Sequence, residues 1–173
     1  MTSTNPPDNS PIGTSGANPA DSAALRAAFG AFMTGVTVVT TKRPDGAPVG
    51  FTANSFTSVS LTPPLILVCI AKTSQNIEVF RATDGYAVNI LAEGQEDISR
   101  RFAGPVADRF AGVEWATGPA GAPVLGGVCG WFDCTMYNQV DAGDHLILIG
   151  EVKGFDHSKR AALGYAAGGY FRL

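Results

Sequence analysis

The chain has 173 residues, 45% of them apolar and 16% charged, which is enough for one domain with a complete hydrophobic core. Its net charge of −3, without a cluster of Lys and Arg, argues against a nucleic-acid partner. The longest apolar run, LILVCIA, is far shorter than the ~20 residues of a membrane-spanning helix, so no membrane partner is expected. The three cysteines, Cys69, Cys129 and Cys134, lack CxxC spacing, and the N-terminus lacks a secretory h-region. Both features favour free thiols and a cytoplasmic location.

Residues 1–20 are rich in Pro, Ser, Asn and Gly, and they predict a disordered tail ahead of a single domain at 21–173. A helix capped by Asp21 or Ser22 is expected to begin the domain. Its apolar residues recur at helical spacing and form one stripe, made by Leu25, Ala28, Phe29 and Phe32.

Four runs of β-branched or apolar residues then predict strands, at 36–42, 49–61, 65–71 and 86–91. The second run is either one long strand or two strands joined at Asn54-Ser55. The third run is apolar throughout, so burial on both faces is expected. Helices are predicted at 74–82, with Ser74 as the N-cap, and at 93–102.

The segment at 104–124 is rich in Gly, Ala and Pro and is expected to be mostly loop, with a short strand at 113–115. Two long strands at 127–140 and 145–155, joined by the turn at 141–144, predict a hairpin. The glycine-rich end GYAAGGYFRL is expected to be another loop. Tight turns rather than helical crossovers join most strands, so the pattern predicts an antiparallel barrel with short peripheral helices.

The first candidate site is a strand that carries more hydroxyl and amide groups than a core strand needs. Strand periodicity places Thr52, Asn54, Phe56, Ser58 and Ser60 on one face. A flavin ring offers an apolar edge and a polar pyrimidine edge, and small hydroxyl residues let the backbone approach it closely. A solvent-facing strand rich in Ser and Thr would give the same pattern, so both interpretations stay open here.

The second candidate is KTSQN at 72–76, between a buried strand and an expected helix start. Unpaired N–H groups at such a start attract anions, and Lys72 adds positive charge. A plain helix cap with a surface lysine is the alternative. Arg100, Arg101 and Arg109 would either close over a second phosphate or form a solvated basic face.

His145 follows the predicted turn at 141–144 and therefore stands at a strand end, where binding sites often lie. With Asp144 beside it, the imidazole could stack on a ring, donate a hydrogen bond or act as a general acid. A turn histidine bonded to backbone is the alternative. No Ser-His-Asp order, no paired carboxylates and no metal-ligand spacing are found, so no metal site is predicted.

Nearly everything after the tail consists of characteristic segments, which appear in the order TGVTVVTT, GFTANSFTSVSLTPPL, IAKTSQN, YAVNIL, RRFAG, GDHLILIGEV and GGYFRL. In these segments the chain resembles the short-chain flavin reductases of the FMN-binding split-barrel superfamily. Those proteins are the reductase components of two-component flavin-dependent monooxygenases. The resemblance implies a mainly β fold, a six-stranded antiparallel split barrel of Greek-key type that works as a homodimer.

The resemblance also implies site residues. The flavin ring and ribityl would contact Thr52, Ala53, Asn54 and Ser55, and the polar edge of the ring would contact Ser58, Val59 and Ser60. The ribityl phosphate would be reached by Ala71, Lys72, Ser74 and Asn76. Phe102 and Arg109 would lie near the flavin tail. His145 would be the catalytic residue at the nicotinamide, with Tyr170 helping to close the site.

The implied reaction is hydride transfer from NADH to FAD or FMN, with reduced flavin released to a separate monooxygenase. NADPH remains possible, because only the lack of clustered arginines for a 2′-phosphate favours NADH. Hydride transfer between stacked rings needs position and orientation rather than a nucleophile, which agrees with the missing acid–base dyad. The alternatives are a split-barrel protein that holds FMN for electron transfer or sensing, and an oxidase of the pyridoxamine-phosphate type.

Overall fold

The computed structural model describes residues 16–172. Most of the predicted tail, residues 1–15, lies outside the described residues. Residues 16–20 are exposed and lead into the first helix. None of the helices in the described part has the length and apolar character needed to cross a bilayer.

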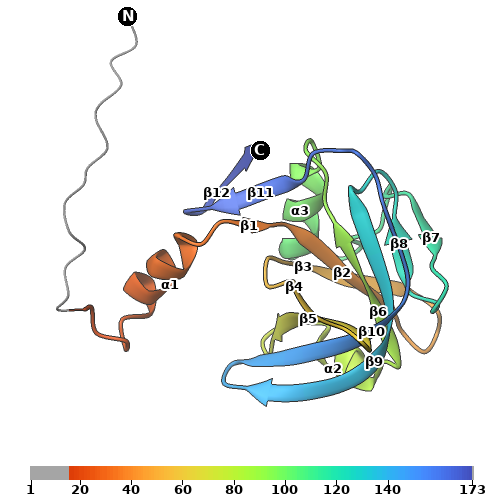
Figure 1. Cartoon of the computed structure of the whole chain (residues 1–173), viewed down its shortest axis with the longest axis horizontal. Coiled ribbons are helices and arrows are strands. Elements are labelled where there is room, and N and C mark those ends of the chain that lie inside the picture. The colour runs from red at the N-terminus through yellow and green to blue at the C-terminus, as the bar shows by residue number, and fades with distance from the viewer. Residues whose placement is uncertain (1–15, 173) are drawn as a thin grey trace, which may run out of the picture.

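The fold is mainly β, and its centre is one antiparallel sheet with the strand order β3-β2-β6-β9-β10-β5-β4 (Figure 1). Its strands are β2 (Thr37–Lys42), β3 (Pro48–Ala53), β4 (Thr57–Leu61), β5 (Pro64–Ala71), β6 (Gly85–Ile90), β9 (Gly130–Ala142) and β10 (His145–His157). The prediction of a mainly β, antiparallel fold is confirmed, whereas the predicted closed barrel of six strands is not confirmed. Within the described residues the sheet has seven strands, and its end strands β3 and β4 do not pair with each other. The sheet nevertheless curls, which brings β3 close to β5.

The hydroxyl-rich segment forms two strands, because the chain bends at Asn54-Ser55 between β3 and β4. Strand β5 follows after the double proline. Its side chains alternate between fully buried ones, at Ile66, Val68 and Ile70, and half-buried ones between them. The expectation of burial on both faces was therefore wrong, since one face of β5 stays partly open.

Three short helices lie outside the sheet. Helix α1 (Ser22–Gly30) begins at Asp21, whose carboxylate accepts the N–H groups of Ala23 and Ala24, each at 3.1 Å. Helix α2 (Ile77–Ala82) has Asn76 rather than the predicted Ser74 as its N-cap. Helix α3 (Glu96–Ala103) packs on β3 and buries Ser99 and Phe102.

Two segments predicted as loop contain strands. The glycine-rich C-terminus forms a hairpin of β11 (Leu163–Ala166) and β12 (Gly169–Arg172), and β11 also pairs with β1 (Thr34–Gly35). Its turn places Ala167 and Gly168 at φ of 47° and 80°, a region that glycine adopts without strain. The loop at 104–124 contributes β7 (Trp115–Thr117), which lies two residues beyond the expected strand, and its partner β8 (Pro123–Leu125).

The core has two parts, one on each face of β2. Val39 belongs to a cluster inside the curl of the sheet, together with Val68, Phe80, Tyr86 and Leu148. Val38 points to the opposite face and packs in a second cluster that includes Leu91, Phe102, Phe110 and Leu163. The three cysteines are free thiols. Covered on both faces, β2 and β6 give the edge strand β3 a rigid support.

Candidate functional site

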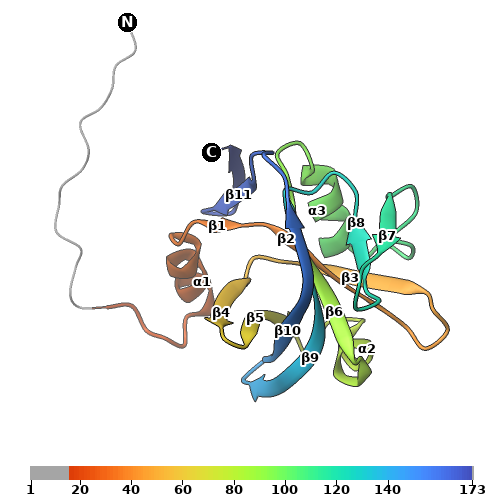
Figure 2. The ribbon, with the colours of Figure 1, turned by 45° about the vertical axis from the view of Figure 1, so that its right-hand side comes forward.

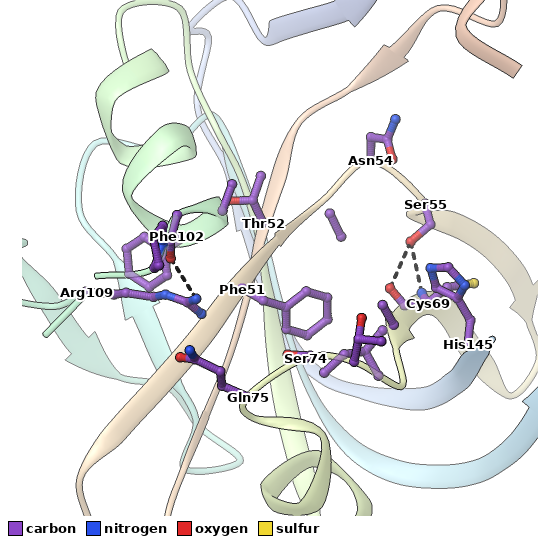
Figure 3. Close-up of a pocket in the computed structure, with 17 residues that line it drawn as sticks. Phe51, Thr52, Asn54, Ser55, Cys69, Ser74, Gln75, Phe102, Arg109 and His145 are labelled. Carbon is purple, nitrogen blue, oxygen red and sulfur yellow. Dashed lines mark hydrogen bonds between the residues drawn. The ribbon is translucent and has the colours of Figure 1, made fainter. Parts of the chain in front are cut away.

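A cleft of about 490 Å³ opens along β3 and the end of β5 (Figure 3). Its walls come from β3 and the bend after it, from β5 and the loop at 73–75, from the end of α3, and from His145. The predicted residues that line it are Thr52, Ala53, Asn54, Ser55, Ala71, Ser74, Phe102, Arg109 and His145. Residues from five separated segments of the chain therefore meet in one space.

Strand β3 is an end strand of the sheet, so one of its edges has no strand partner in the described part of the chain. The Gly50 carbonyl lies on that open edge, because it accepts hydrogen bonds from the side chains of Asn76 at 3.3 Å and Arg109 at 2.7 Å. Backbone groups alternate along a strand, so the N–H and C=O of Thr52 face the same open edge. The Thr52 hydroxyl donates a hydrogen bond to the Ser99 carbonyl at 2.6 Å, so its proton is already used within the protein. Thr52 thus offers a ligand its backbone.

The Ser55 hydroxyl fixes the bend after β3 against β5. It accepts the N–H of Cys69 at 2.9 Å and faces the Cys69 carbonyl at 3.4 Å. Burial raises the pKa of the Cys69 thiol, so this cleft residue is a poor nucleophile. Asn54, at the bend, is exposed at the rim of the cleft.

Arg109 closes the end of the cleft farthest from His145 (Figure 3). Its guanidinium donates to Gly50 at 2.7 Å and to Gly104 at 2.8 Å, and so ties β3 to the loop after α3. Burial lowers the pKa of Arg109, although an arginine remains charged at any physiological pH. No carboxylate lines the cleft within the described residues. Arg109 therefore gives this end a positive charge suited to an anionic group.

His145 occupies the other end, where β10 begins. It pairs with Ala71, so the imidazole lies beside the loop that follows β5. Lys72 N–H donates to the Asp144 carbonyl at 2.9 Å and holds the β9–β10 turn against the same loop. The imidazole Nδ1 lies 2.7 Å from an Asp144 carboxylate oxygen, and this contact lowers the pKa of Asp144. Both side chains are exposed, His145 by 44%.

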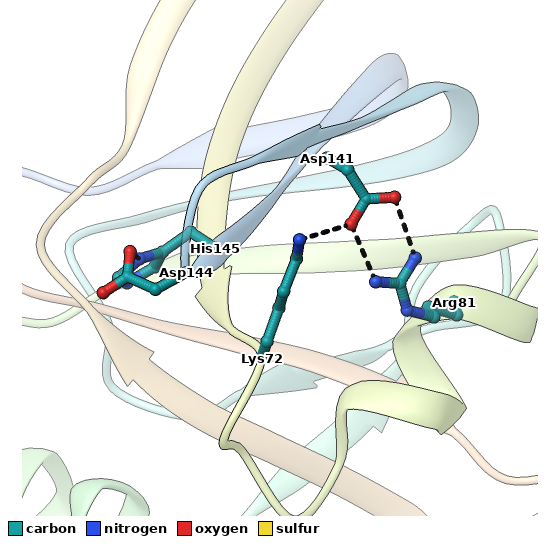
Figure 4. Close-up of polar contacts among 5 residues, drawn as sticks. All are labelled: Lys72, Arg81, Asp141, Asp144 and His145. Carbon is teal, nitrogen blue, oxygen red and sulfur yellow. Dashed lines mark hydrogen bonds and ion pairs between the residues drawn. The ribbon is translucent and has the colours of Figure 1, made fainter.

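Lys72 does not line the cleft. Its ammonium lies 2.9 Å from Asp141, which also pairs with Arg81 of α2 at 2.9 Å. Figure 4 shows these side chains meeting apart from the Asp144–His145 pair. The two cations lower the pKa of Asp141 below its ordinary value. Because Lys72 precedes the loop at 73–75 and Arg81 follows it, this cluster holds both ends of the loop.

Other predicted residues lie near the cleft or away from it. Ser58, Val59 and Ser60 are on β4, the other end strand of the sheet, and Val59 is 48% exposed. Asn76 is buried beneath the loop, bonded to Gly50. Tyr170 lines a smaller cavity of about 210 Å³ behind Thr52–Asn54, and its hydroxyl lies 2.9 Å from that of Ser99. Their roles at a flavin or nicotinamide remain predictions.

Some lining residues were missed from sequence. Thr73 and Gln75 lie within the IAKTSQN segment, and Ala103 and Gly104 lie within RRFAG, so those motifs contained the signal. The remaining missed residues are Phe51, Cys69, Ile70 and Pro105. Phe51 and Ile70 also lie within quoted motifs, GFTANSFTSVSLTPPL and IAKTSQN, but they are apolar strand residues that look like ordinary core. Pro105 lies just beyond RRFAG, outside every motif.

Comparison with known proteins adds to this geometry. The family described as flavin reductase like domain matches residues 29–173, most of the chain. This chain belongs to that family. Among its relatives in the flavin reductase family is the stachydrine N-demethylase reductase subunit Stc3 of Rhizobium meliloti, 54% identical over 151 residues, which are 87% of this chain and 66% of the relative. The reductase component of the trigonelline monooxygenase of Acinetobacter baylyi is 58% identical over 147 residues, 85% of this chain and 47% of that protein.

A solved structure shows the same fold. The NADH:FAD oxidoreductase SgcE6 of Streptomyces globisporus, in complex with NAD and FAD fragments, superposes with a TM-score of 0.85 at 39% identity. That match covers 90% of this chain and 94% of SgcE6. By contrast, this chain spans 66%, 49% and 47% of the lengths of the first three relatives it matches in sequence. Between a third and about half of each of those relatives therefore has no counterpart in the match.

Proposed function

We propose that this protein is an NADH:flavin oxidoreductase that reduces FAD or FMN and releases the reduced flavin. The observation that carries the proposal is the pairing of His145 with Ala71, which sets the GDH turn against the cleft formed by the TANS and KTSQN segments. Two planar rings could therefore stack inside the cleft, one against the TANS and KTSQN segments and the other against the GDH turn. The name of SgcE6, an NADH:FAD oxidoreductase with the same fold, supports this reading.

In the proposed complex, the open edge of β3 at Thr52 and the bend at Asn54-Ser55 bind the flavin ring. Ser74 and the loop around it bind the ribityl phosphate, and Arg109 binds the tail beyond it. His145 touches the nicotinamide and is the proposed catalytic residue. When bound, the flavin accepts a hydride from NADH and one proton, giving NAD⁺ and reduced flavin. The chain supplies proximity and orientation, in a cleft lined by no described carboxylate.

We infer that the reduced flavin passes to a separate monooxygenase. Relatives named as reductase subunits or components of monooxygenases support this inference, among them HsaB of Mycobacterium tuberculosis, 40% identical over 133 residues. The cleft opens at the protein surface, which suits a flavin that enters and leaves. Free cysteines and a reaction that uses NADH agree with a cytoplasmic location.

We also propose that the protein is a homodimer. Large apolar side chains are exposed on α1 and just after it, with Phe29 67%, Phe32 77% and Met33 56% accessible. Leu61 on the end strand β4 is 94% accessible. In both ribbon views α1, β4 and the tip of the β9–β10 hairpin lie on the same side of the molecule (Figures 1 and 2). An apolar surface next to an unpaired strand edge is typical of an interface.

The dimer is tested by replacing Phe29 and Phe32 together with Ser and measuring mass by light scattering. A dimeric parent and a monomeric, folded variant are expected. The exposed Phe155, on β10, supplies the matched control, because Phe155→Ser should leave the dimer intact. A parent that is monomeric at micromolar concentration would contradict the proposal.

The reaction is tested by following NADH and NADPH oxidation with FAD, FMN or riboflavin added in turn. Turnover that depends on added flavin, and flavin that is lost on dialysis, are expected. The result that would overturn the proposal is a protein that stays yellow through dialysis and oxidises neither nucleotide when free flavin is added. That result would favour a protein that holds FMN for electron transfer or sensing.

A further inference from the structure

Three residues from distant parts of the chain share hydrogen bonds behind the edge strand β3. The Thr52 hydroxyl donates to the carbonyl of Ser99 on α3 at 2.6 Å, and the Ser99 hydroxyl lies 2.9 Å from the hydroxyl of Tyr170 on β12. The first pair is 47 positions apart in sequence and the second pair 71. This Thr52–Ser99–Tyr170 network therefore connects β3, α3 and the C-terminal hairpin.

Ser99 is a polar residue in a buried position of α3, with only 1% of its surface accessible. A serine inside a helix commonly bonds back to a carbonyl of the preceding turn, whereas this hydroxyl lies beside that of Tyr170. Alanine at position 99 and phenylalanine at position 170 would fill the same space, and alanine would favour the helix. Replacing both partners of a buried hydrogen bond by apolar groups of the same shape costs little stability. The polar pair therefore points to a use other than packing.

The Tyr170 ring is held from two sides. The Arg100 guanidinium lies over the ring, 5.2 Å from its centroid. The Tyr165 ring meets it at an angle of 63°, with centroids 5.4 Å apart. The hairpin that carries both tyrosines is tied to the segment after β6, because the Leu163 N–H donates to the Leu91 carbonyl at 2.9 Å. The Tyr170 hydroxyl thus has a defined position from which to hold α3.

At its other end, the network reaches the part of β3 that is proposed to contact the flavin ring. The N–H and C=O of Thr52 face the open edge, whereas the backbone groups of Phe51 and Ala53 face β2. Because the Thr52 side chain is bonded to α3, the residue cannot turn freely about the strand axis. Its backbone groups therefore keep their direction toward the cleft.

From these contacts we propose that Ser99 and Tyr170 are positioning residues, which orient the Thr52 backbone for hydride transfer. The inference rests on the proposed function for the place of the flavin ring. Neither side chain touches the flavin or the nicotinamide in this role. Hydride transfer depends steeply on the distance and alignment of the two rings. A small displacement of the Thr52 edge should therefore slow the transfer more than it weakens flavin binding.

The first test measures the reduction of FAD and FMN by NADH in anaerobic stopped-flow experiments, beside flavin binding by fluorescence. Tyr170→Phe and Ser99→Ala should each slow the reduction about fivefold, the effect of one lost hydrogen bond, while flavin binding changes by less than about twofold. The double variant should be no slower than either single variant, because both lose the same bond. Tyr165→Phe is the matched control, since its hydroxyl is not part of the network, and it should keep the parental rate.

The second test uses the flavin-free protein. Amide hydrogen exchange at Phe51 and Ala53 reports how often β3 separates from β2. Thr52→Val removes the hydroxyl at the end of the network and should speed this exchange about tenfold. Both single variants of the first test should speed it about threefold, and the Tyr165→Phe control should leave it unchanged.

Slower flavin reduction together with faster exchange in β3 upholds the inference. An active parent whose Tyr170→Phe and Ser99→Ala variants reduce flavin at the parental rate overturns it and leaves the proposed function intact. A Tyr170→Phe variant that raises the KM for NADH, with no change in Ser99→Ala, also overturns it, because Tyr170 would then contact the nicotinamide directly. Unchanged exchange in β3 overturns it as well, since the effect would not pass through Thr52. A parent that binds flavin but transfers no hydride sinks the proposed function, and this inference with it.

Discussion

The two ends of the cleft are built differently. At the Arg109 end, side chains from distant segments bond to backbone carbonyls, and Gly50 accepts from both Arg109 and Asn76. At the His145 end, the contacts join exposed side chains, Asp144 with His145 and Asp141 with Lys72 and Arg81. Bonds to half-buried backbone contribute more to stability than exposed ion pairs do. We therefore expect the Arg109 end to be preformed and the His145 end to be adjustable.

This difference suits the proposed function. A flavin must be recognised with a defined orientation, which a preformed end provides at little entropic cost. The nicotinamide must arrive, transfer a hydride and leave, and an exposed turn with weak ties permits that exchange. Four changes test the comparison, two at each end.

The largest effect is expected from Arg109→Ala. It removes two charged hydrogen bonds, of 2.7 and 2.8 Å, that join β3 to the loop after α3. The free energy of unfolding should fall by about 3 kcal/mol in urea denaturation, because bonds from a charged donor contribute about 1.5–3 kcal/mol each. Arg109→Lys should recover only part of it, since an ammonium cannot span both carbonyls. Arg160→Ala is the control, and a loss for Arg109→Ala no larger than for this exposed residue would contradict a preformed end.

Gly50→Ala should have the next largest effect. A Cβ at this position would meet the Val39 carbonyl oxygen at 2.8 Å and the Phe102 ring at 3.0 Å. The carbonyl is part of the sheet and cannot move aside, so we expect a loss of about 2 kcal/mol, typical of overpacking. Gly35→Ala is the matched control, because nothing lies within 4 Å of its added Cβ. Equal stability of the two variants would show that β3 adjusts more freely than its contacts suggest.

The same difference explains what the sequence could and could not predict. Thr52–Ser55 and the turn before His145 lie in short motifs whose geometry is set locally, by strand alternation and by a tight turn. Gly143, at φ 58°, makes that turn possible. Such features can be inferred from a few neighbouring residues. The cleft accordingly collects these residues as expected.

Features that depend on distant partners could not be predicted in this way. Only the family resemblance placed Arg109 near the flavin tail, because the residue bonds to a partner 59 positions away and its place at the cleft follows from that tertiary contact. From its sequence context, Lys72 is predicted to contact a phosphate. In the folded chain its ammonium instead pairs with Asp141, which is distant in sequence. The C-terminal segment is predicted to be a loop because it is rich in glycine. It becomes a hairpin because Ala167 and Gly168 adopt positive φ and β1 is present to pair with β11.

At the adjustable end, His145→Ala should raise the KM for NADH about tenfold, the effect of losing one contact of about 1.4 kcal/mol. Flavin binding should change by less than twofold, because the imidazole is exposed and is bonded only to Asp144 in the described structure. His157→Ala, at the opposite end of β10, is the matched control. Unchanged NADH kinetics in His145→Ala would remove the role given to this residue.

The smallest effect is expected from Asp141→Asn, which releases Lys72 and Arg81 from each other and so frees both ends of the loop at 73–75. Exposed ion pairs are weak, so the KM for FMN should rise only about two- to fivefold. Riboflavin should be unaffected, because it lacks the phosphate that the loop is proposed to hold. Asp97→Asn breaks an exposed pair within α3 and serves as the control.

The pH dependence of the same cluster follows from the direction of its pKa shift. Lys72 and Arg81 lower the pKa of Asp141 in the folded protein. The contribution of the cluster is therefore complete above the ordinary carboxyl pKa of about 3.9, and it is lost only as the pH falls through the lowered value. Between pH 5 and 8, the ratio of the FMN KM values of Asp141→Asn and the parent should thus stay constant. A ratio that changes across this range would mean that a group other than Asp141 controls the loop.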